Sequence, residues 1–409
     1  MEIGKGRSIE LTRHSQLTKI SYSKTRLTIP VWRGEPFGGG FKMKKLLASL
    51  LAVTMIASLA LVGCGDSKDK GTGDSSGDSK GGIKSICFVT TNLGDKSFND
   101  IANDGIVNSG KKLGLEYKVI EYGTDKSKME PAFLDAAENF DMVFFSSGEQ
   151  LELIQRHAEE FSDVKFVGFD IDPDKDPKFP NIFCITYAQN EGDFLAGALA
   201  MKISKTGVIG FVGGAEAPVI NDFMVGYIEG ALHAKADGKV AIAFVGDYTN
   251  APKAKEFALL QITTNKADVL HGVAGGAGLG VFEAAADNKG VWGIGVDADQ
   301  RQFFVDSKPE IANVILTSML KRNDIAIEDI VTRTCNGDTS DFGTIKKWGV
   351  EKEVTVLVEN DYYKENTTEE QRAFVDECKK GIIDGSIKVS TGYGMDQDTL
   401  NALRNKAKA

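Results

Sequence analysis

The 409-residue sequence has few of the residues, and few of the patterns, on which catalytic and metal sites usually depend. It contains five cysteines, none in C-x-x-C or metal-site spacing. Its four histidines are scattered, and it has no H-E-x-x-H or Walker A motif. Acid–base catalysis by paired aspartates stays open as an alternative. We expect a protein that is not an enzyme and uses neither cofactor nor metal.

The sequence also lacks an excess of positive charge. Its 48 Lys and Arg residues are outnumbered by 58 Asp and Glu residues, which gives a net charge of −10. Basic residues outnumber acidic ones in residues 1–63, so the remainder is more acidic than the whole chain. Proteins that bind nucleic acid need a basic surface for the phosphates. We therefore expect no nucleic-acid partner.

An apolar run at residues 46–62 is short for a membrane-spanning helix of about 20 residues, which is the alternative reading. It follows the basic Met43-Lys-Lys and ends in Leu61-Val-Gly-Cys64, which is the layout of a secretory signal. The ending resembles the lipobox of bacterial lipoproteins, which predicts lipid on Cys64. Because one acyl chain binds a membrane only marginally, we expect several on Cys64. The protein would then be anchored on the extracytoplasmic face of the cell membrane.

These features divide the N-terminal part of the chain into three predicted segments. Residues 1–42 precede the signal, and we expect them to be a non-native extension, with translation starting at Met43. Residues 43–63 are the predicted lipoprotein signal peptide. Residues 64–82 are rich in Gly, Ser, Asp and Lys, which predicts a flexible linker.

From residue 83 onward, short apolar strands alternate with helical segments, and the same order restarts near residue 207. Near-continuous apolar strands separated by helices are typical of parallel sheets covered on both faces. The pattern predicts an α/β protein with two doubly wound parallel-sheet lobes joined by a hinge.

The expected lobe boundaries follow from where this order restarts. Residues 83–188 with about 318–345 are predicted to form lobe one, and residues 189–317 with about 346–409 lobe two. We expect the apolar segment 181–187 to be a sheet edge or a crossing, and segment 315–319 to cross back between the lobes.

Two predicted strands end in the same pattern, Gly-x-Asp, at Asp170 and at Asp297. Ligands of open parallel sheets bind beyond the carboxyl ends of the strands, so we expect both acids at a shared cleft. Hydrogen bonds to a charged group contribute about 1.5–3 kcal/mol each. With two oxygens, Asp297 suits a pair of neighbouring hydroxyls. The alternative for Asp297 is a structural role in capping the next turn.

The cleft is also predicted to hold aromatic rings and a glycine-rich turn. Phe98 follows the first strand of lobe one and Tyr248 the second strand of lobe two, so the two rings could sandwich a flat ligand. Such stacking contributes about 1–3 kcal/mol per base; alternatively, each ring packs on its own helix. The turn at 275–280 fails the G-x-G-x-x-G spacing at Val281, but its backbone N–H groups can still face the cleft.

Lys321 and Arg322 open a predicted helix, where positive charges oppose the helix dipole. Either a ligand or Asp324 should therefore stabilise at least one of them.

Several motifs together resemble one known family. They are Asp95-Lys-Ser-Phe-Asn99, Gly192-Asp-Phe-Leu-Ala-Gly197, Phe211-Val-Gly-Gly214, Phe223-x-x-Gly-Tyr-x-x-Gly230, Ala274-Gly-Gly-x-Gly278, Gly295-Val-Asp-Ala-Asp-Gln300 and Leu316-Thr-Ser-Met-Leu-Lys-Arg322. In this order they resemble the basic membrane lipoproteins, the purine-nucleoside-binding receptors of bacterial ABC transporters.

The resemblance implies a type I periplasmic-binding-protein fold with three hinge crossings, a nucleoside ligand and an ABC permease partner, with the protein acting as a monomer. It implies base stacking by Phe98 and Tyr248, ribose contact by Asp297, a base-contacting acid at Asp170 and a cleft lysine at Lys321. Together with these patterns, it predicts ten ligand-binding residues: Asn92, Asp95, Phe98, Asn99, Asp170, Tyr248, Gly275, Gly276, Asp297 and Lys321. A sugar or other small polar ligand, or an adhesin or signalling lipoprotein, are the alternatives.

Overall fold

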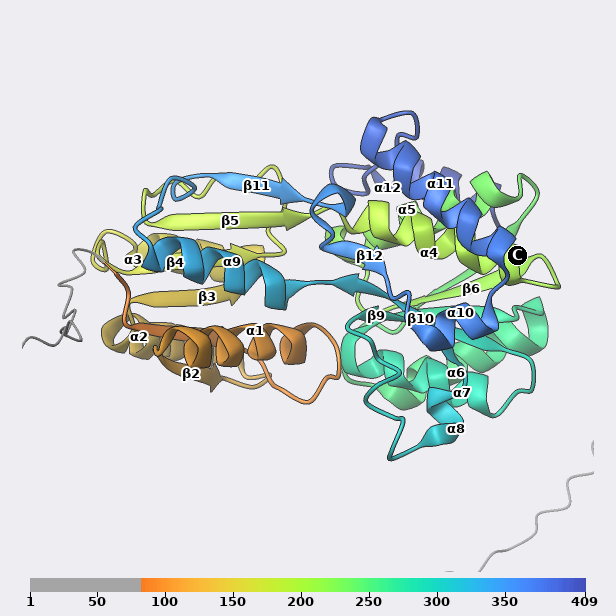
Figure 1. Ribbon diagram of the computed structural model, residues 1–409, viewed down its shortest axis with the longest axis horizontal. Helices are drawn as coiled ribbons and strands as arrows, with labels where there is room; N and C mark the ends of the chain where they lie inside the picture. Colours follow the sequence, from red (N-terminus) through yellow and green to blue (C-terminus); the bar gives the residue numbers. More distant parts are fainter. Residues whose placement is uncertain (1–81) are drawn as a thin grey trace, which may run out of the picture. The chain divides into compact units, whose positions relative to one another are not determined.

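The computed structural model describes residues 82–409 (Figure 1). The predicted extension, signal peptide and lipidated Cys64, and all of the linker before residue 82, lie outside the described residues. The described chain contains two sheets of six strands each, which define lobe one and lobe two. In residues 82–409 we find no helix that is both long enough and apolar enough to cross a membrane.

The elements of the two lobes are as follows. Lobe one contains β1 (Ser85–Thr90), α1 (Phe98–Leu113), β2 (Glu116–Glu121), α2 (Met129–Asn139), β3 (Met142–Ser146), α3 (Gly148–His157), β4 (Lys165–Phe169), β5 (Ile182–Tyr187), α9 (Asn323–Cys335) and β11 (Ile345–Trp348). Lobe two contains α4 (Gln189–Ile203), β6 (Val208–Gly213), α5 (Pro218–Ala234), β7 (Lys239–Phe244), α6 (Ala251–Leu260), β8 (Val269–Val273), α7 (Leu279–Ala286), β9 (Trp292–Asp297), α8 (Pro309–Ala312), β10 (Ile315–Lys321), β12 (Thr355–Leu357), α10 (Asp361–Asn366), α11 (Glu369–Asp384) and α12 (Gln397–Lys406).

The sheet of lobe one is parallel throughout, in the order β11-β5-β4-β3-β1-β2. Alternate residues of β1 face opposite layers. Ile86 and Phe88 pack with α1 and α9, whereas Cys87 and Val89 pack with α2 and α3 (Figure 1). Both faces of the strand are therefore apolar, which explains the near-continuous apolar strands of the sequence.

The sheet of lobe two repeats this plan, in the order β12-β10-β9-β8-β6-β7. Its core packs α4 and α5 on one face and α6 and α7 on the other. The predicted fold class of two parallel-sheet α/β lobes is confirmed. The sequence predicts a last strand at 354–358, and β12 lies there, but it is antiparallel to β10, whereas a parallel sheet was expected.

Glycines allow an unusually close approach of α4 and α5. A Cβ atom on Gly226 would lie 2.0 Å from the carbonyl oxygen of Asn190, and one on Gly230 would lie 2.0 Å from that of Phe194. Atoms do not approach this closely without displacement, so side chains at these two positions would push the helices apart. The helix that begins at the first crossing is thereby fixed against the core of lobe two.

The chain passes between the lobes three times: after β5, after β10, and between β11 and β12. Two predictions about these segments were wrong. Segment 181–187 is β5, which lies inside its sheet between β4 and β11. Segment 315–319 belongs to β10, which pairs with β9 and crosses only after Lys321.

The predicted lobe boundaries near 318 and 345 also fall inside strands, namely β10 and β11. Strand β11 has the sequence Ile345-Lys-Lys-Trp348, and its two exposed lysines hide the strand from a search for apolar runs. Pairing partners from distant parts of the chain decide the lobe to which such segments belong.

Candidate functional site

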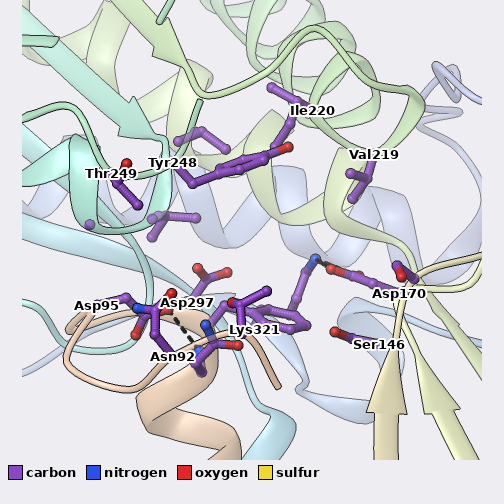
Figure 2. Close-up of a pocket in the computed structure, with 18 of the residues that line it drawn as sticks. Asn92, Asp95, Ser146, Asp170, Val219, Ile220, Tyr248, Thr249, Asp297 and Lys321 are labelled. Carbon is purple, nitrogen blue, oxygen red and sulfur yellow. Dashed lines mark hydrogen bonds and ion pairs between the residues drawn. The ribbon is translucent and has the colours of Figure 1, made fainter. Parts of the chain in front are cut away.

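A cavity of about 520 Å³ lies between the carboxyl ends of the strands of the two lobes (Figure 2). All ten residues predicted to bind ligand line this cavity: Asn92, Asp95, Phe98, Asn99, Asp170, Tyr248, Gly275, Gly276, Asp297 and Lys321. The topology explains the convergence, because the carboxyl ends of parallel strands meet at one rim of each sheet and the two rims face each other.

Other residues of the cavity wall were missed from the sequence. Ser146 ends β3 and Ser147 follows it, so the rule that located Asp170 and Asp297 would also have located them. Val219, Ile220 and Phe223, from the first turns of α5, complete the wall. Apolar residues at the start of a helix resemble ordinary core residues, and no sequence signal distinguishes them.

Asp170 and Lys321 form an ion pair that joins the lobes (Figure 2). The Lys321 ammonium lies 2.6 and 2.7 Å from the two Asp170 carboxylate oxygens. Lys321 is 1% exposed, and its ammonium also lies 4.7–5.4 Å from the centres of three aromatic rings, those of Phe98, Tyr187 and Phe223. Aromatic faces attract a cation, so the rings and the carboxylate together stabilise a buried lysine.

Each of the two cations that precede α9 has an acidic partner. Arg322 donates two hydrogen bonds of 2.8 Å to the carboxylate of Asp324, and Lys321 pairs with Asp170.

Asp297 is held differently. It is 6% exposed, and one of its carboxylate oxygens, Oδ2, accepts a hydrogen bond from the hydroxyl of Ser97 in lobe one. Burial raises the pKa of Asp297 to about 6, although Lys321 and the Ser97 hydroxyl act in the opposite direction. The expectation of two free oxygens for a diol is corrected, because Ser97 occupies one of them.

Asp95 caps the first turn of α1. Its carboxylate accepts backbone N–H groups of Ser97, Asn99 and Asp100 at 3.0, 2.9 and 3.1 Å. Burial raises its pKa, and these three N–H groups oppose that shift. Asp95 therefore lines the cavity while its carboxylate is engaged with the backbone.

Two asparagines lie in the same wall. The Asn99 side-chain oxygen accepts a 2.8 Å hydrogen bond from the hydroxyl of Thr90, at the end of β1. Asn92 donates to the carbonyl oxygen of Leu93 at 3.3 Å.

The two aromatic rings differ in their packing. Tyr248 is 41% exposed and faces Asp297 and Lys321 across the cavity (Figure 2). Its ring lies on Gly214, where a Cβ atom would be 2.4 Å from a ring carbon. Phe98 is partly buried against the core of lobe one, with its ring centre 5.6 Å from that of Phe169. Tyr248 is thus the more accessible platform for a flat ligand.

The glycine-rich turn forms a short 3-10 helix, Gly275–Gly278, beneath Tyr248. The Ala277 N–H donates to the Tyr248 carbonyl oxygen at 2.8 Å. A Cβ atom on Gly276 would lie 3.8 Å from the Asp95 Cα atom of lobe one. The glycine-rich turn of lobe two therefore lies directly against the Asp95 turn of lobe one.

Carboxylates, amides and an accessible aromatic ring thus surround a cavity between two hinged lobes, as in two-lobed binding proteins. A sequence model of the Bmp family, described as ABC transporter substrate-binding protein PnrA-like, matches residues 83–389, and the chain belongs to this family. The role implies a ligand, a permease partner and a location outside the cytoplasm.

Relatives support the same assignment. The chain is 32% identical over 365 residues to the ABC transporter nucleoside-binding protein BmpA of Lactococcus lactis subsp. cremoris, covering 85% of this chain and 99% of the relative. It is 32% identical over 368 residues to a CD4+ T-cell-stimulating antigen of Listeria innocua, with the same coverage. A solute-binding protein of an ABC transporter system from Aeropyrum pernix has the same fold, with a TM-score of 0.67 at 22% identity over 79% of this chain and 98% of that one.

Proposed function

We propose that the protein captures a nucleoside, of the purine type, between its lobes and delivers it to an ABC permease. In this proposal the protein acts as a monomer tethered to the outer face of the cell membrane by lipid on Cys64. The name of the Lactococcus lactis relative, a nucleoside-binding protein, supports the ligand class.

One feature of the cavity carries the proposal. An accessible aromatic ring, Tyr248, lies opposite the carboxylate of Asp297 across a space of about 520 Å³. A nucleoside has a flat base and a polyol, and these two surfaces call for a stacking platform on one side and hydrogen-bond acceptors on the other. Cavities of 300–1,000 Å³ hold ligands of this size.

The polar groups of the cavity wall also suit a nucleoside. Asp297 Oδ1 is the carboxylate oxygen not engaged by Ser97, and in this proposal it accepts one ribose hydroxyl. Ser146, Asn92 and Asn99 supply hydroxyl and amide groups along the wall for the base edge. The Asp170 carboxylate is paired with Lys321, and the Asp95 carboxylate accepts three backbone N–H groups. We therefore assign the ligand hydroxyl to Asp297 and not to these two acids.

The proposal is tested by calorimetry on the purified protein with adenosine, guanosine, cytidine, adenine, ribose and glucose. We expect purine nucleosides to bind at least tenfold more tightly than adenine or ribose alone, because only the whole ligand contacts both walls. Tight binding of glucose or ribose without any nucleoside preference would replace the nucleoside with a sugar. Failure of every ligand in the panel would contradict the proposal.

The anchor has its own test. Replacing Cys64 with serine removes the sulfur that would carry lipid, and the variant should accumulate as an unprocessed precursor. Metabolic labelling with a fatty acid and fractionation of membranes would report the change. A Cys64→Ser protein that is cleaved and membrane-bound like the parent protein would refute lipidation at this residue.

A further inference from the structure

A second set of contacts joins the lobes beside the cavity. The residues Lys96 and Ser97 of lobe one meet the segment 297–304 of lobe two, which follows β9. Neither Lys96, Ser97 nor the central partner Gln300 lines the cavity.

Three contacts make up this junction. The Ser97 hydroxyl donates to Asp297 Oδ2, and Ser97 has no exposed surface. The Gln300 side-chain amide donates to the Lys96 carbonyl oxygen at 2.8 Å, and Gln300 is 1% exposed. The Lys96 ammonium lies 5.1 Å from the centre of the Phe303 ring. Hydrogen bonds sheltered from water to this degree are costly to leave unmade.

Lobe one holds its side of the junction in a fixed form. The Asp100 carboxylate accepts the backbone N–H groups of Gly94 and Lys96 at 2.7 and 2.8 Å. Lys96 itself has φ = 52°, a left-handed conformation that a lysine rarely adopts and that surrounding contacts must maintain. The turn therefore presents the Lys96 carbonyl and the Ser97 hydroxyl outward toward lobe two.

Lobe two also holds its side of the junction, Gln300, in a fixed form. The Gln300 backbone N–H donates to the hydroxyl of Ser318 at 3.1 Å. The Gln300 side-chain oxygen accepts the backbone N–H of Val296 at 3.0 Å. One end of the amide is thereby fixed within lobe two, and the other end, the NH₂ group, is directed at lobe one.

We propose that Lys96, Ser97 and Gln300 form a clasp that holds the lobes together and positions the carboxylate of Asp297. The part of the proposal that concerns ligand release rests on the proposed nucleoside function. Ser97 fixes Oδ2 of Asp297, so the orientation of Oδ1 toward the cavity is set before the ligand arrives. The ligand can leave only when the lobes separate, which requires the clasp to open. Loss of the clasp should therefore act on the rate of ligand dissociation.

Gln300→Glu is the sharpest variant. A glutamate keeps the oxygen that accepts the Val296 N–H, but it replaces the NH₂ donor with an oxygen that repels the Lys96 carbonyl. Ser97→Ala removes the second bond, and Ser97→Thr restores a hydroxyl. At a pH high enough to ionise the introduced glutamate, whose pKa burial raises, each loss should raise the adenosine dissociation rate about tenfold, with the association rate little changed.

Gln150 offers a matched control. Its side-chain oxygen accepts the backbone N–H of Ser146, four residues earlier, at 2.7 Å, and its amide donates to the Tyr122 hydroxyl at 3.0 Å. The arrangement copies that of Gln300, but all partners lie in lobe one. Gln150→Glu keeps an oxygen that can accept the Ser146 N–H and alters no contact between the lobes, so it should leave the dissociation rate unchanged.

Stopped-flow dissociation of adenosine and small-angle X-ray scattering of the ligand-free protein test the proposal together. The clasp predicts faster dissociation in Gln300→Glu and Ser97→Ala, recovery in Ser97→Thr, and a larger radius of gyration of the ligand-free Gln300→Glu protein. Unchanged dissociation in both variants, or an equal effect of Gln150→Glu, would overturn it.

The scattering measurement separates this proposal from the proposed function. If the parent protein binds no nucleoside, the function fails, yet a larger radius of gyration in ligand-free Gln300→Glu would still support the clasp. The same radius in all variants would refute it.

Discussion

The third strand from the edge of each sheet, β4 in lobe one and β9 in lobe two, is followed or ended by an aspartate of a Gly-x-Asp sequence. Both aspartates, Asp170 and Asp297, have left-handed backbone conformations, with φ of 60° and 67°. Asp170 is neutralised by a lysine at 2.6 Å, whereas Asp297 receives only a hydroxyl from the opposite lobe. At equivalent positions of the two lobes, one aspartate is thus paired with a cation and the other is not.

The difference originates on the neighbouring strand. At its end, lobe one has Tyr187 on β5, and lobe two has Lys321 on β10. The Lys321 ammonium bonds to Asp170 of lobe one and not to Asp297 on the neighbouring strand. Lobe two supplies the cation, lobe one supplies its counterion, and Asp297 keeps a charge that a ligand can use.

The largest predicted effect comes from breaking the neutralised pair. Lys321→Met leaves the Asp170 carboxylate without its cation, and Asp170→Asn leaves a buried lysine without its anion. Each should reduce the free energy of unfolding by about 3 kcal/mol, since removing one partner of a buried ion pair is costly. The double variant should lose less than the sum of the two. Urea denaturation of the four proteins measures this, and strictly additive losses would show that the pair is not coupled.

The aromatic rings sharpen the comparison of the lobes. Tyr248→Ala should weaken nucleoside binding by about 1–3 kcal/mol while the melting temperature of the ligand-free protein stays nearly constant, because the ring is 41% exposed. Phe98→Ala should weaken nucleoside binding and also lower the melting temperature, because Phe98 packs on Phe169 in the core of lobe one. Calorimetry and thermal unfolding of the two variants separate the roles. A large loss of stability in Tyr248→Ala would contradict this assignment.

The acids also predict a pH dependence. Burial raises the pKa of Asp297 to about 6, so its carboxylate takes up a proton as the pH falls from 7 to 5 and loses one acceptor. Nucleoside affinity should drop about tenfold over this range, which corresponds to about 1.4 kcal/mol. Calorimetry at several pH values measures the drop. An identical profile in Asp297→Asn would mean that another group titrates.

Stability should change in the opposite direction. A carboxyl group whose folded pKa is raised binds a proton more readily when folded, so it costs stability above about pH 6, and that cost disappears toward pH 4. Asp222, whose pKa burial also raises to about 6, contributes with the same sign. The loss of affinity at low pH should therefore not be accompanied by a loss of stability from these two groups.

The sequence was sufficient for the features that follow from local pattern. Apolar strands separated by helices predicted both sheets, and the strand ends located Asp170, Asp297 and the glycine turn. The contacts between the lobes could not be predicted from the sequence, because Ser97 and Asp297 are 200 residues apart and Asp170 and Lys321 are 151 apart. No local pattern encodes which of two acids receives a single lysine, because the packing of two lobes decides it.

The same limit applies to the capping role of Asp95 and to the clasp. The sequence marks Asp95 as an acid at a strand–helix turn, but three backbone N–H groups occupy its carboxylate in the folded protein. Gln300 stands in a recognisable motif, but its partner is the carbonyl group of Lys96, a group that every residue carries.

The account depends most on the claim that Asp297 reads a ribose hydroxyl. Calorimetry of the parent protein and Asp297→Asn with guanosine and 2′-deoxyguanosine tests it directly. The parent protein should prefer guanosine, and the preference should shrink by about 1 kcal/mol, the net value of one hydrogen bond, in Asp297→Asn. An unchanged ratio between the two nucleosides would mean that Asp297 serves the junction with Ser97 alone.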